Sequence, residues 1–285
     1  MNRMETPFDR RAKRLHRTRA GASIGQHDFL LRLAAEEIGA RLQERGQRFT
    51  RGAALGGGAP LLEALRPHCD ALVHADLSGA MGPDVVADEE FNPFAREAFD
   101  LVASSLVLHW VNDLPGALIQ IARTLRPEGL FLGAMLGGET LRELRIAFVD
   151  GEGDTRGGVS PHVSPFVDVR DAGMLLQRAG FRDPVADIDT FTVTYTDPMQ
   201  LMHELRGMGE ANALHGRSKT MLPRSTLLAT AAAYRSRFGT ADGRVPATFQ
   251  IITLTARAPD PAGALAAERR RAAAPPLRLR PEKPT

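Results

Sequence analysis

The stretch from Ala53 to Asp76, AALGGGAPLLEALRPHCDALVHAD, carries the first strand, turn, helix and second strand of an α/β pattern. AAL is a short apolar run that ends at three glycines, Gly56, Gly57 and Gly58. PLLEALRP has the composition of a short helix, and ALVHAD is the next strand candidate. Strands that alternate with short helices predict a sheet of parallel strands.

The same alternation continues toward the C-terminus. Residues 85–88 are a third strand candidate, and residues 99–108, FDLVASSLVL, form a fourth that is apolar on both faces, as a buried parallel strand should be. We expect a helix over residues 113–125, a turn at 126–129 and a fifth strand over 130–135. Together these elements predict a doubly wound sheet with helices on both faces.

The second half of the chain is less regular. We expect a helix over residues 139–148, a long loop over 150–168, and strands at 185–195 and 247–257 that enclose helices near 197–208 and 225–238. Asp168 and Ser225 are the expected N-caps of the two helices that they precede. The predicted organisation is a helical segment over residues 1–45, a core domain over 46–257 with lid insertions near 136–170 and 196–245, and a disordered tail over 258–285.

Composition excludes several classes of protein. The single cysteine, Cys69, allows neither an internal disulfide nor a thiolate metal cluster, and we expect no metal site. No window reaches the roughly 18 apolar residues of a membrane span, although peripheral membrane contact stays open. Residues 1–19 hold seven Lys or Arg and two Asp or Glu. We interpret them as a solvated basic helix, with no aromatic-basic pattern for nucleic acid and no secretory signal. The expected location is cytoplasmic; a mitochondrial presequence is the alternative.

Three features suited to a nucleotide-like ligand follow three successive strands. The glycines at 56–58 let the backbone approach a ligand closely. Asp76 ends the second strand, where a carboxylate can accept hydrogen bonds from ribose hydroxyls, and Asp88, Glu89 and Glu90 end the third. Taken alone, the glycines could simply form a tight turn, and each acid could be a solvated loop residue. Because ligands of open α/β sheets bind at the carboxyl ends of strands, we expect the three to form one site.

The sequence also resembles a known family. VHADLSGAM from Val73, ADEEFNPF, FDLVASSLVLHWVNDLPGAL and LRPEGLFLGAM resemble the motifs of class I S-adenosylmethionine-dependent methyltransferases. GAMLGGETLRELR, GGVSPHVSPF, LRGMGEAN and VPATFQI are similar to the mitochondrial complex I assembly factor 5 family, which itself resembles the malonyl-carrier-protein methyltransferase of biotin synthesis. The resemblance implies an α/β, Rossmann-like class I methyltransferase fold. Its seven-stranded sheet should be mainly parallel, with an antiparallel last strand and added helical and lid segments.

The resemblance implies S-adenosyl-L-methionine as the cofactor and assigns roles to individual residues. The residues implied to bind the cofactor are Gly56, Gly58, Asp76, Leu77, Asp88, Glu89, Ser104, Ser105 and Leu106. His109 is the candidate general base, with packing against Trp110 as its alternative role. The residues implied to face the substrate are Trp110, Arg142, Arg145, His162 and Glu210. Arg142 and Arg145 lie three residues apart and could clamp a carboxylate.

One position departs from the family pattern. Ala54 replaces the acid of the D-L-G-x-G sequence, which helps to hold the methionine amino group. Losing such a hydrogen bond costs about 1.5–3 kcal/mol, or roughly 10–100-fold in affinity. We therefore expect a methyltransferase acting on a protein or carrier-protein substrate, with a complex I subunit as one candidate partner. A protein arginine hydroxylase on the same scaffold and a non-catalytic assembly chaperone are the alternatives. A nicotinamide-dependent oxidoreductase is disfavoured by the glycine spacing.

Overall fold

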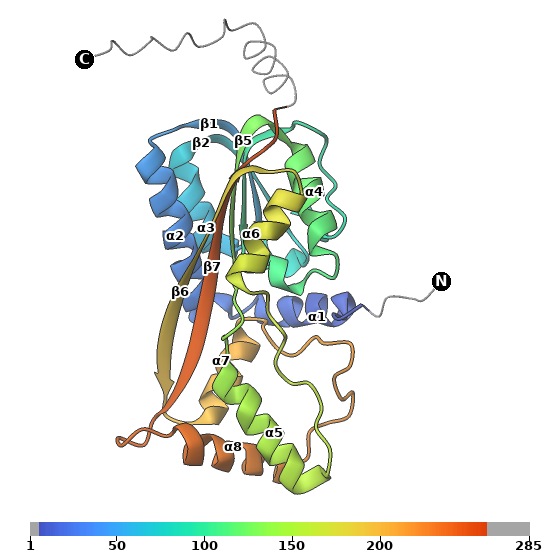
Figure 1. Ribbon diagram of the computed structural model, residues 1–285, viewed down its shortest axis with the longest axis vertical. Helices are drawn as coiled ribbons and strands as arrows, with labels where there is room; N and C mark the ends of the chain where they lie inside the picture. The colour runs from blue at the N-terminus through green and yellow to red at the C-terminus, as the bar shows by residue number, and fades with distance from the viewer. Residues whose placement is uncertain (1–5, 261–285) are drawn as a thin grey trace, which may run out of the picture.

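A computed structural model describes residues 6–260 and shows a seven-stranded sheet flanked by helices (Figure 1). The strand order is β3-β2-β1-β4-β5-β7-β6. Strands β1 to β5 pair with one another in parallel, whereas β7 runs antiparallel to both β5 and β6. The strands are β1 (Phe49–Gly56), β2 (Cys69–Asp76), β3 (Val85–Val86), β4 (Phe99–Ser105), β5 (Leu125–Leu136), β6 (Arg182–Tyr195) and β7 (Val245–Arg257). The predicted fold class is confirmed.

Helices cover both faces of the sheet. The α-helices of the described residues are α1 (Arg10–Ala20), α2 (Phe29–Arg45), α3 (Gly58–Leu65), α4 (Leu114–Thr124), α5 (Arg142–Arg156), α6 (Val169–Arg178), α7 (Pro198–Gly207) and α8 (Arg224–Phe238). One buried cluster joins α2 and α3 to the sheet, and a second joins α4 and α6 to its other face. Because β4 is buried between these two layers, its sequence is apolar in both alternating sets of positions, as expected.

The second half of the chain forms a layer below the sheet in Figure 1, where α5, α7 and α8 gather beyond the carboxyl ends of β1 to β5. Strands β6 and β7 are long enough to reach this layer from the sheet. Helix α1 crosses between the sheet and the layer. The carboxyl edge of the parallel strands is therefore covered by α1 and by the layer of α5, α7 and α8.

Three expectations about local structure were wrong. Helix α5 begins at Arg142 and continues to Arg156, through the first part of the predicted loop. A β-carbon added at Gly151 would lie 2.3 Å from the Thr230 hydroxyl of α8, so this glycine allows two helices to approach closely instead of breaking one. The N-cap of α8 is Pro223, not Ser225. The third strand is only two residues long, Val85–Val86.

Other local expectations hold. Asp168 is the N-cap of α6 and accepts a hydrogen bond from the Arg170 backbone N–H. The predicted N-terminal helical segment contains two helices, α1 and α2, and Gly21 and Gly25 lie between them. The predicted tail lies largely outside the described residues. Within residues 6–260, no helix is long and apolar enough to cross a membrane.

Candidate functional site

The glycine turn after β1 adopts a conformation that side chains rarely tolerate. Gly56, Gly57 and Gly58 have φ values of +68°, +72° and +58°. A β-carbon on Gly56 would lie 2.3 Å from Val107 Cγ1, and one on Gly57 would lie 2.9 Å from Ser105 Cβ. The turn is therefore pressed against the end of β4, and glycine is required for both conformation and space.

The end of β4 carries strain and unpaired polar groups beside this turn. Leu106 is buried with a φ of +52°, in the left-handed region. The buried Oγ atoms of Ser104 and Ser105 have no hydrogen-bond partner among the described residues. Buried hydroxyls are normally satisfied, and strained backbone tends to occur at functional sites. The end of β4 thus has the properties of a ligand-binding segment.

Asp76 lies at the end of β2, as the sequence predicted, but its carboxylate already has a partner. Arg17 of α1 donates to both carboxylate oxygens, with Nε 3.0 Å from Oδ1. The Ser78 backbone N–H also donates to Oδ1, at 2.9 Å. The side chains of Arg17 and Asp76 are 2% and 0% exposed, so this ion pair is fully buried. The adjacent Leu77 is buried as well.

The acids that follow β3 are held by the first residue of the same helix. The Arg10 guanidinium is 2.5 Å from Asp88 Oδ1, contacts Glu89 and lies 3.7 Å from Glu90. Beside these acids is a narrow recess of about 10 Å³, lined mainly by Leu55, Ala75, Ala87, Asp88, Glu89 and Phe94. Its apolar walls and its two carboxylates suit a planar base with an amino group. In this conformation, the recess is too small to hold one.

A third cation on α1 completes the pattern. Lys13 is 1% exposed, and its Nζ lies 2.7 Å from Glu210 Oε1 and 2.9 Å from the Gly209 carbonyl oxygen. Arg10, Lys13 and Arg17 follow the i, i+3, i+7 spacing of one helix face, and each pairs with acids at the carboxyl edge. The interpretation of the basic N-terminus as a solvated helix was therefore wrong. That spacing is the sequence signal that could have identified this face.

Glu210 connects α1 to the residues after β4. Its Oε2 accepts a 2.6 Å hydrogen bond from Trp110 Nε1 and lies 3.3 Å from His109 Nε2. Burial lowers the pKa of the Lys13 ammonium to about 8, although the Glu210 carboxylate opposes this effect. Burial alone would raise the pKa of Glu210, but Lys13 and the hydrogen bond from His109 hold it well below its ordinary value.

His109 is almost completely buried, and both of its ring nitrogens are engaged. Nε2 faces Glu210, and Nδ1 lies 3.4 Å from the backbone N–H of Leu136, which fits a neutral ring protonated on Nε2. Burial lowers the pKa of His109, which favours this neutral form. The arrangement suits the packing and positioning role that the sequence left open for His109. Acting as a base would require one of these contacts to break.

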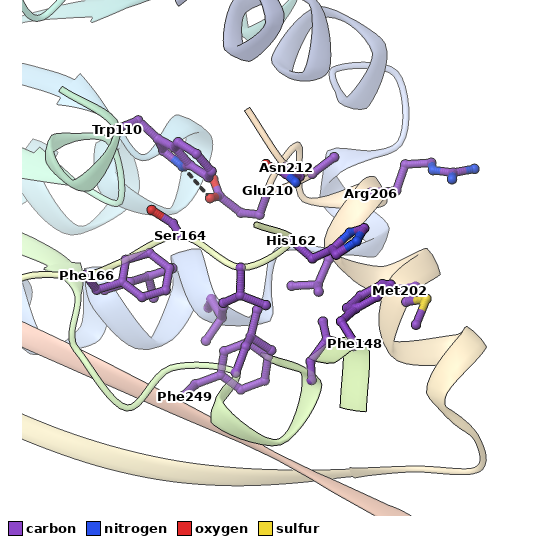
Figure 2. A pocket seen from close by; sticks show the side chains of 17 residues that line it. Trp110, Phe148, His162, Ser164, Phe166, Met202, Arg206, Glu210, Asn212 and Phe249 are labelled. Atoms are coloured by element: carbon purple, nitrogen blue, oxygen red, sulfur yellow. Dashed lines mark hydrogen bonds between the residues drawn. The ribbon is translucent and has the colours of Figure 1, made fainter. Parts of the chain in front are cut away.

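An apolar cavity of about 170 Å³ lies next to this cluster (Figure 2). Its walls come from α2, α5, α7, β7 and the loop before α6, and they include Leu30, Trp110, Leu144, Phe148, His162, Phe166, Met202, Leu205, Glu210 and Phe249. Most of these side chains are apolar, and Glu210 contributes a carboxylate to one wall. The cavity could hold an apolar chain or ring whose polar end meets Glu210.

The remaining predicted substrate residues divide into two groups. Trp110, His162 and Glu210 line the cavity. His162 stacks on Phe148 with ring centroids 3.9 Å apart, and its Nε2 lies 3.0 Å from Glu152. Arg142 and Arg145 do not line the cavity. Arg142 is exposed and pairs with Glu139 and Glu143, while Arg145 donates to the Ser164 carbonyl oxygen at 3.2 Å.

The sequence could not identify the apolar walls of the cavity, because Phe148, Phe166, Met202 and Phe249 resemble ordinary core residues.

Within residues 6–260, no group of three or more His, Cys, Asp or Glu side chains is arranged to hold a metal ion.

Ala54 lies in the middle of β1 and is completely buried. Its partner in the register with β2 is His74, whose two buried ring nitrogens have no hydrogen-bond partner among the described residues. An acid at position 54 would therefore be placed next to an unsatisfied imidazole.

Comparison with known proteins agrees with this description. A family model described as "Methyltransferase domain" matches residues 53–133, which include the glycine turn, Asp76 and β4. The crystal structure of YcgJ from Bacillus subtilis is similar to this chain, with a TM-score of 0.52 and 14% sequence identity. The match covers 79% of this chain and 99% of YcgJ, and it concerns the fold alone.

Two curated relatives are more similar in sequence. A malonyl-(acyl-carrier protein) O-methyltransferase of Halorhodospira halophila is 40% identical over 168 residues, which are 59% of this chain and 55% of that protein. The protein named "Arginine-hydroxylase NDUFAF5, mitochondrial" of Danio rerio is 40% identical over 280 residues, covering 92% of this chain and 86% of its own length. With its methyltransferase fold and this extended similarity, the chain belongs to the methyltransferase-like NDUFAF5 family.

Proposed function

We propose that this protein is an S-adenosylmethionine-dependent methyltransferase that acts on a protein or carrier-protein substrate, in a process linked to respiratory complex I assembly. The observation that carries the proposal is the gathering of the glycine turn, Asp76, Asp88 and Glu89 at one edge of a methyltransferase-fold sheet. The malonyl-(acyl-carrier protein) methyltransferase relative supports a carrier-linked substrate, and the NDUFAF5 relative supports a protein substrate. A cytoplasmic location stays a prediction.

The chemical groups at the carboxyl edge match those that S-adenosylmethionine requires. Asp76 suits the ribose, the narrow recess beside Asp88 suits adenine, and the unpaired Ser105 hydroxyl beside the glycine turn suits a polar ligand group. When bound, S-adenosylmethionine supplies a methyl group activated by a sulfonium. The protein's part is to align the acceptor in the apolar cavity and to exclude water from it.

The present conformation is closed to the cofactor. Because Arg17 engages both oxygens of Asp76, and Arg10 engages Asp88 and Glu89, these acids have to be released before they can bind a nucleoside. The cofactor therefore competes with the protein's own cations for the same carboxylates.

Calorimetric titration with S-adenosylmethionine tests this proposal. The native protein should bind, and Arg17→Gln should bind roughly tenfold more tightly because the competing charge is gone. Arg17→Lys is the matched control, since it keeps the positive charge and should stay close to native. Failure of all three proteins to bind would reject the methyltransferase assignment, and weaker binding by Arg17→Gln would reject the competition.

Arginine hydroxylation is a second candidate, favoured by the 40% identity over 280 residues to a protein named arginine-hydroxylase. The Glu210 carboxylate in an apolar cavity could pair with a guanidinium. Mass spectrometry of a treated substrate separates the two reactions, because methylation adds one methyl group and hydroxylation adds one oxygen atom. An unmodified substrate that still binds the protein would favour the third interpretation, a non-catalytic chaperone.

A further inference from the structure

A second hollow lies at the surface beside the apolar cavity. It has a volume of about 450 Å³ and is formed by α1, the turn before α2, and α7. Its lining side chains are basic or small, and none is an aspartate or glutamate: His16, Arg19, Ala20, Ser23, His27, His203, Arg206, Gly207 and Ala211. We call this hollow the basic recess.

The arginines of the basic recess are available to a ligand. Within residues 6–260, the side chains of Arg19 and Arg206 make no hydrogen bond or ion pair, in contrast to Arg10 and Arg17 of α1. The neighbouring acid Glu204 is directed to His27, with Oε2 2.9 Å from Nδ1. Two guanidinium groups therefore face the recess without a counter-charge.

Three imidazoles, those of His16, His27 and His203, also line the basic recess. The buried Nδ1 of His16 has no hydrogen-bond partner among the described residues. His203 and His27 lie with their rings 5.8 Å apart. A β-carbon on Gly207 would lie 2.2 Å from the His27 ring, so the absence of a side chain at Gly207 lets that ring pack against α7. The walls of the recess are thus set by close packing as well as by charge.

The basic recess adjoins the apolar cavity. Arg206 and Ala211 line both hollows. In Figure 2 the Arg206 side chain extends away from the apolar side chains. The two hollows therefore share part of one wall and lie side by side.

We propose that the basic recess binds a phosphate group carried by the substrate, whose apolar part occupies the adjoining cavity. Guanidinium groups from two helices can donate paired hydrogen bonds to different oxygens of a tetrahedral anion. The identification of this ligand as a substrate rests on the proposed function, whereas phosphate binding by the recess does not.

The test uses the full chain and three probes: inorganic phosphate, hexyl phosphate and hexanol. We expect inorganic phosphate to bind weakly and hexyl phosphate to bind at least tenfold more tightly than either phosphate or hexanol, because it fills both hollows. Arg19→Gln with Arg206→Gln should weaken hexyl phosphate binding by roughly tenfold or more. Arg19→Gln alone, at a residue that lines the recess and not the cavity, should leave hexanol binding unchanged. Arg14→Gln, which removes an exposed arginine of α1 that does not line the recess, is the matched control.

Each outcome has a defined meaning. Equal affinities for inorganic phosphate and hexyl phosphate would show a site for free phosphate, and would overturn the link to the cavity. Hexyl phosphate binding that the double variant leaves unchanged would overturn the recess as the site. Titration of the same proteins with S-adenosylmethionine reports separately on the cofactor edge, so phosphate binding without cofactor binding would reject the proposed function and leave the recess intact.

Discussion

The carboxyl edge of the sheet and the apolar cavity beside it are built in opposite ways. At the edge, Arg10 and Arg17 of α1 already neutralise the acids that a cofactor would use, while Lys13 of the same helix pairs with Glu210. In the cavity, the walls are mostly apolar. The edge has to exchange its charged partners for the hydroxyl and amino groups of a nucleoside, whereas the cavity is preformed. The two regions should therefore respond differently to changes of charge, packing and pH.

The largest effect should come from leaving a buried charge unpaired at the edge. Asp76→Ala strands the Arg17 guanidinium in a site that is 2% exposed, and we expect a loss of about 3–5 kcal/mol in unfolding free energy. Chemical denaturation measures this loss. Adding Arg17→Met should recover much of it, since no unpaired charge then remains. A single Asp76→Ala variant as stable as the native protein would show that the pair is not buried in solution.

The cavity should respond to packing and not to charge. Leu144 is buried and lines the cavity, so Leu144→Ala should cost about 2–4 kcal/mol of unfolding free energy. Denaturation at two salt concentrations provides the check. The loss should be the same at both, because Leu144→Ala changes no charge. A salt-dependent loss in Leu144→Ala would remove the contrast between the two regions.

The pH dependence of stability should follow Glu210, which joins the two regions. Its pKa in the folded protein lies below the ordinary value of 4.5, so its carboxylate stabilises the fold above that pH, and the stabilisation is lost as the pH falls. Glu210→Gln should therefore be less stable at neutral pH, by about 1.5–3 kcal/mol, and should lose less stability on acidification. Denaturation curves between pH 3 and 7 test this, and parallel pH profiles would contradict it.

The smallest effect should come from a cation of α1 that faces solvent. Arg14 is exposed, and its guanidinium makes no ion pair or hydrogen bond within the described residues. Arg14→Gln should change the unfolding free energy by less than about 0.5 kcal/mol. Thermal unfolding beside Arg17→Gln gives the comparison. A similar loss in both variants would mean that total charge, and not the buried face of α1, accounts for the stability.

Much of the fold could be predicted because its signals are local. The alternation of apolar runs with helical segments, and the glycines that end β1, depend on residues close together in the chain. The acids Asp76, Asp88 and Glu89 could be assigned to one edge because parallel strands align their carboxyl ends. Helix α5 was the main error, because Gly151 is required by contact with Thr230, a residue on a distant helix.

What the sequence alone determined was the doubly wound parallel sheet, the glycine turn and the acids at its edge, since strand periodicity and turn chemistry depend on short segments. The class I methyltransferase fold was implied by the resemblance to that family. Only the tertiary structure decided what those acids contact. Arg17 meets Asp76 across 59 residues, and Lys13 meets Glu210 across 197. The cavity and the basic recess are likewise assembled from segments distant in the chain. Such pairings form because packing excludes water, and a buried charge without a partner is unfavourable. A local sequence pattern cannot predict them, because the two partners lie far apart in the chain.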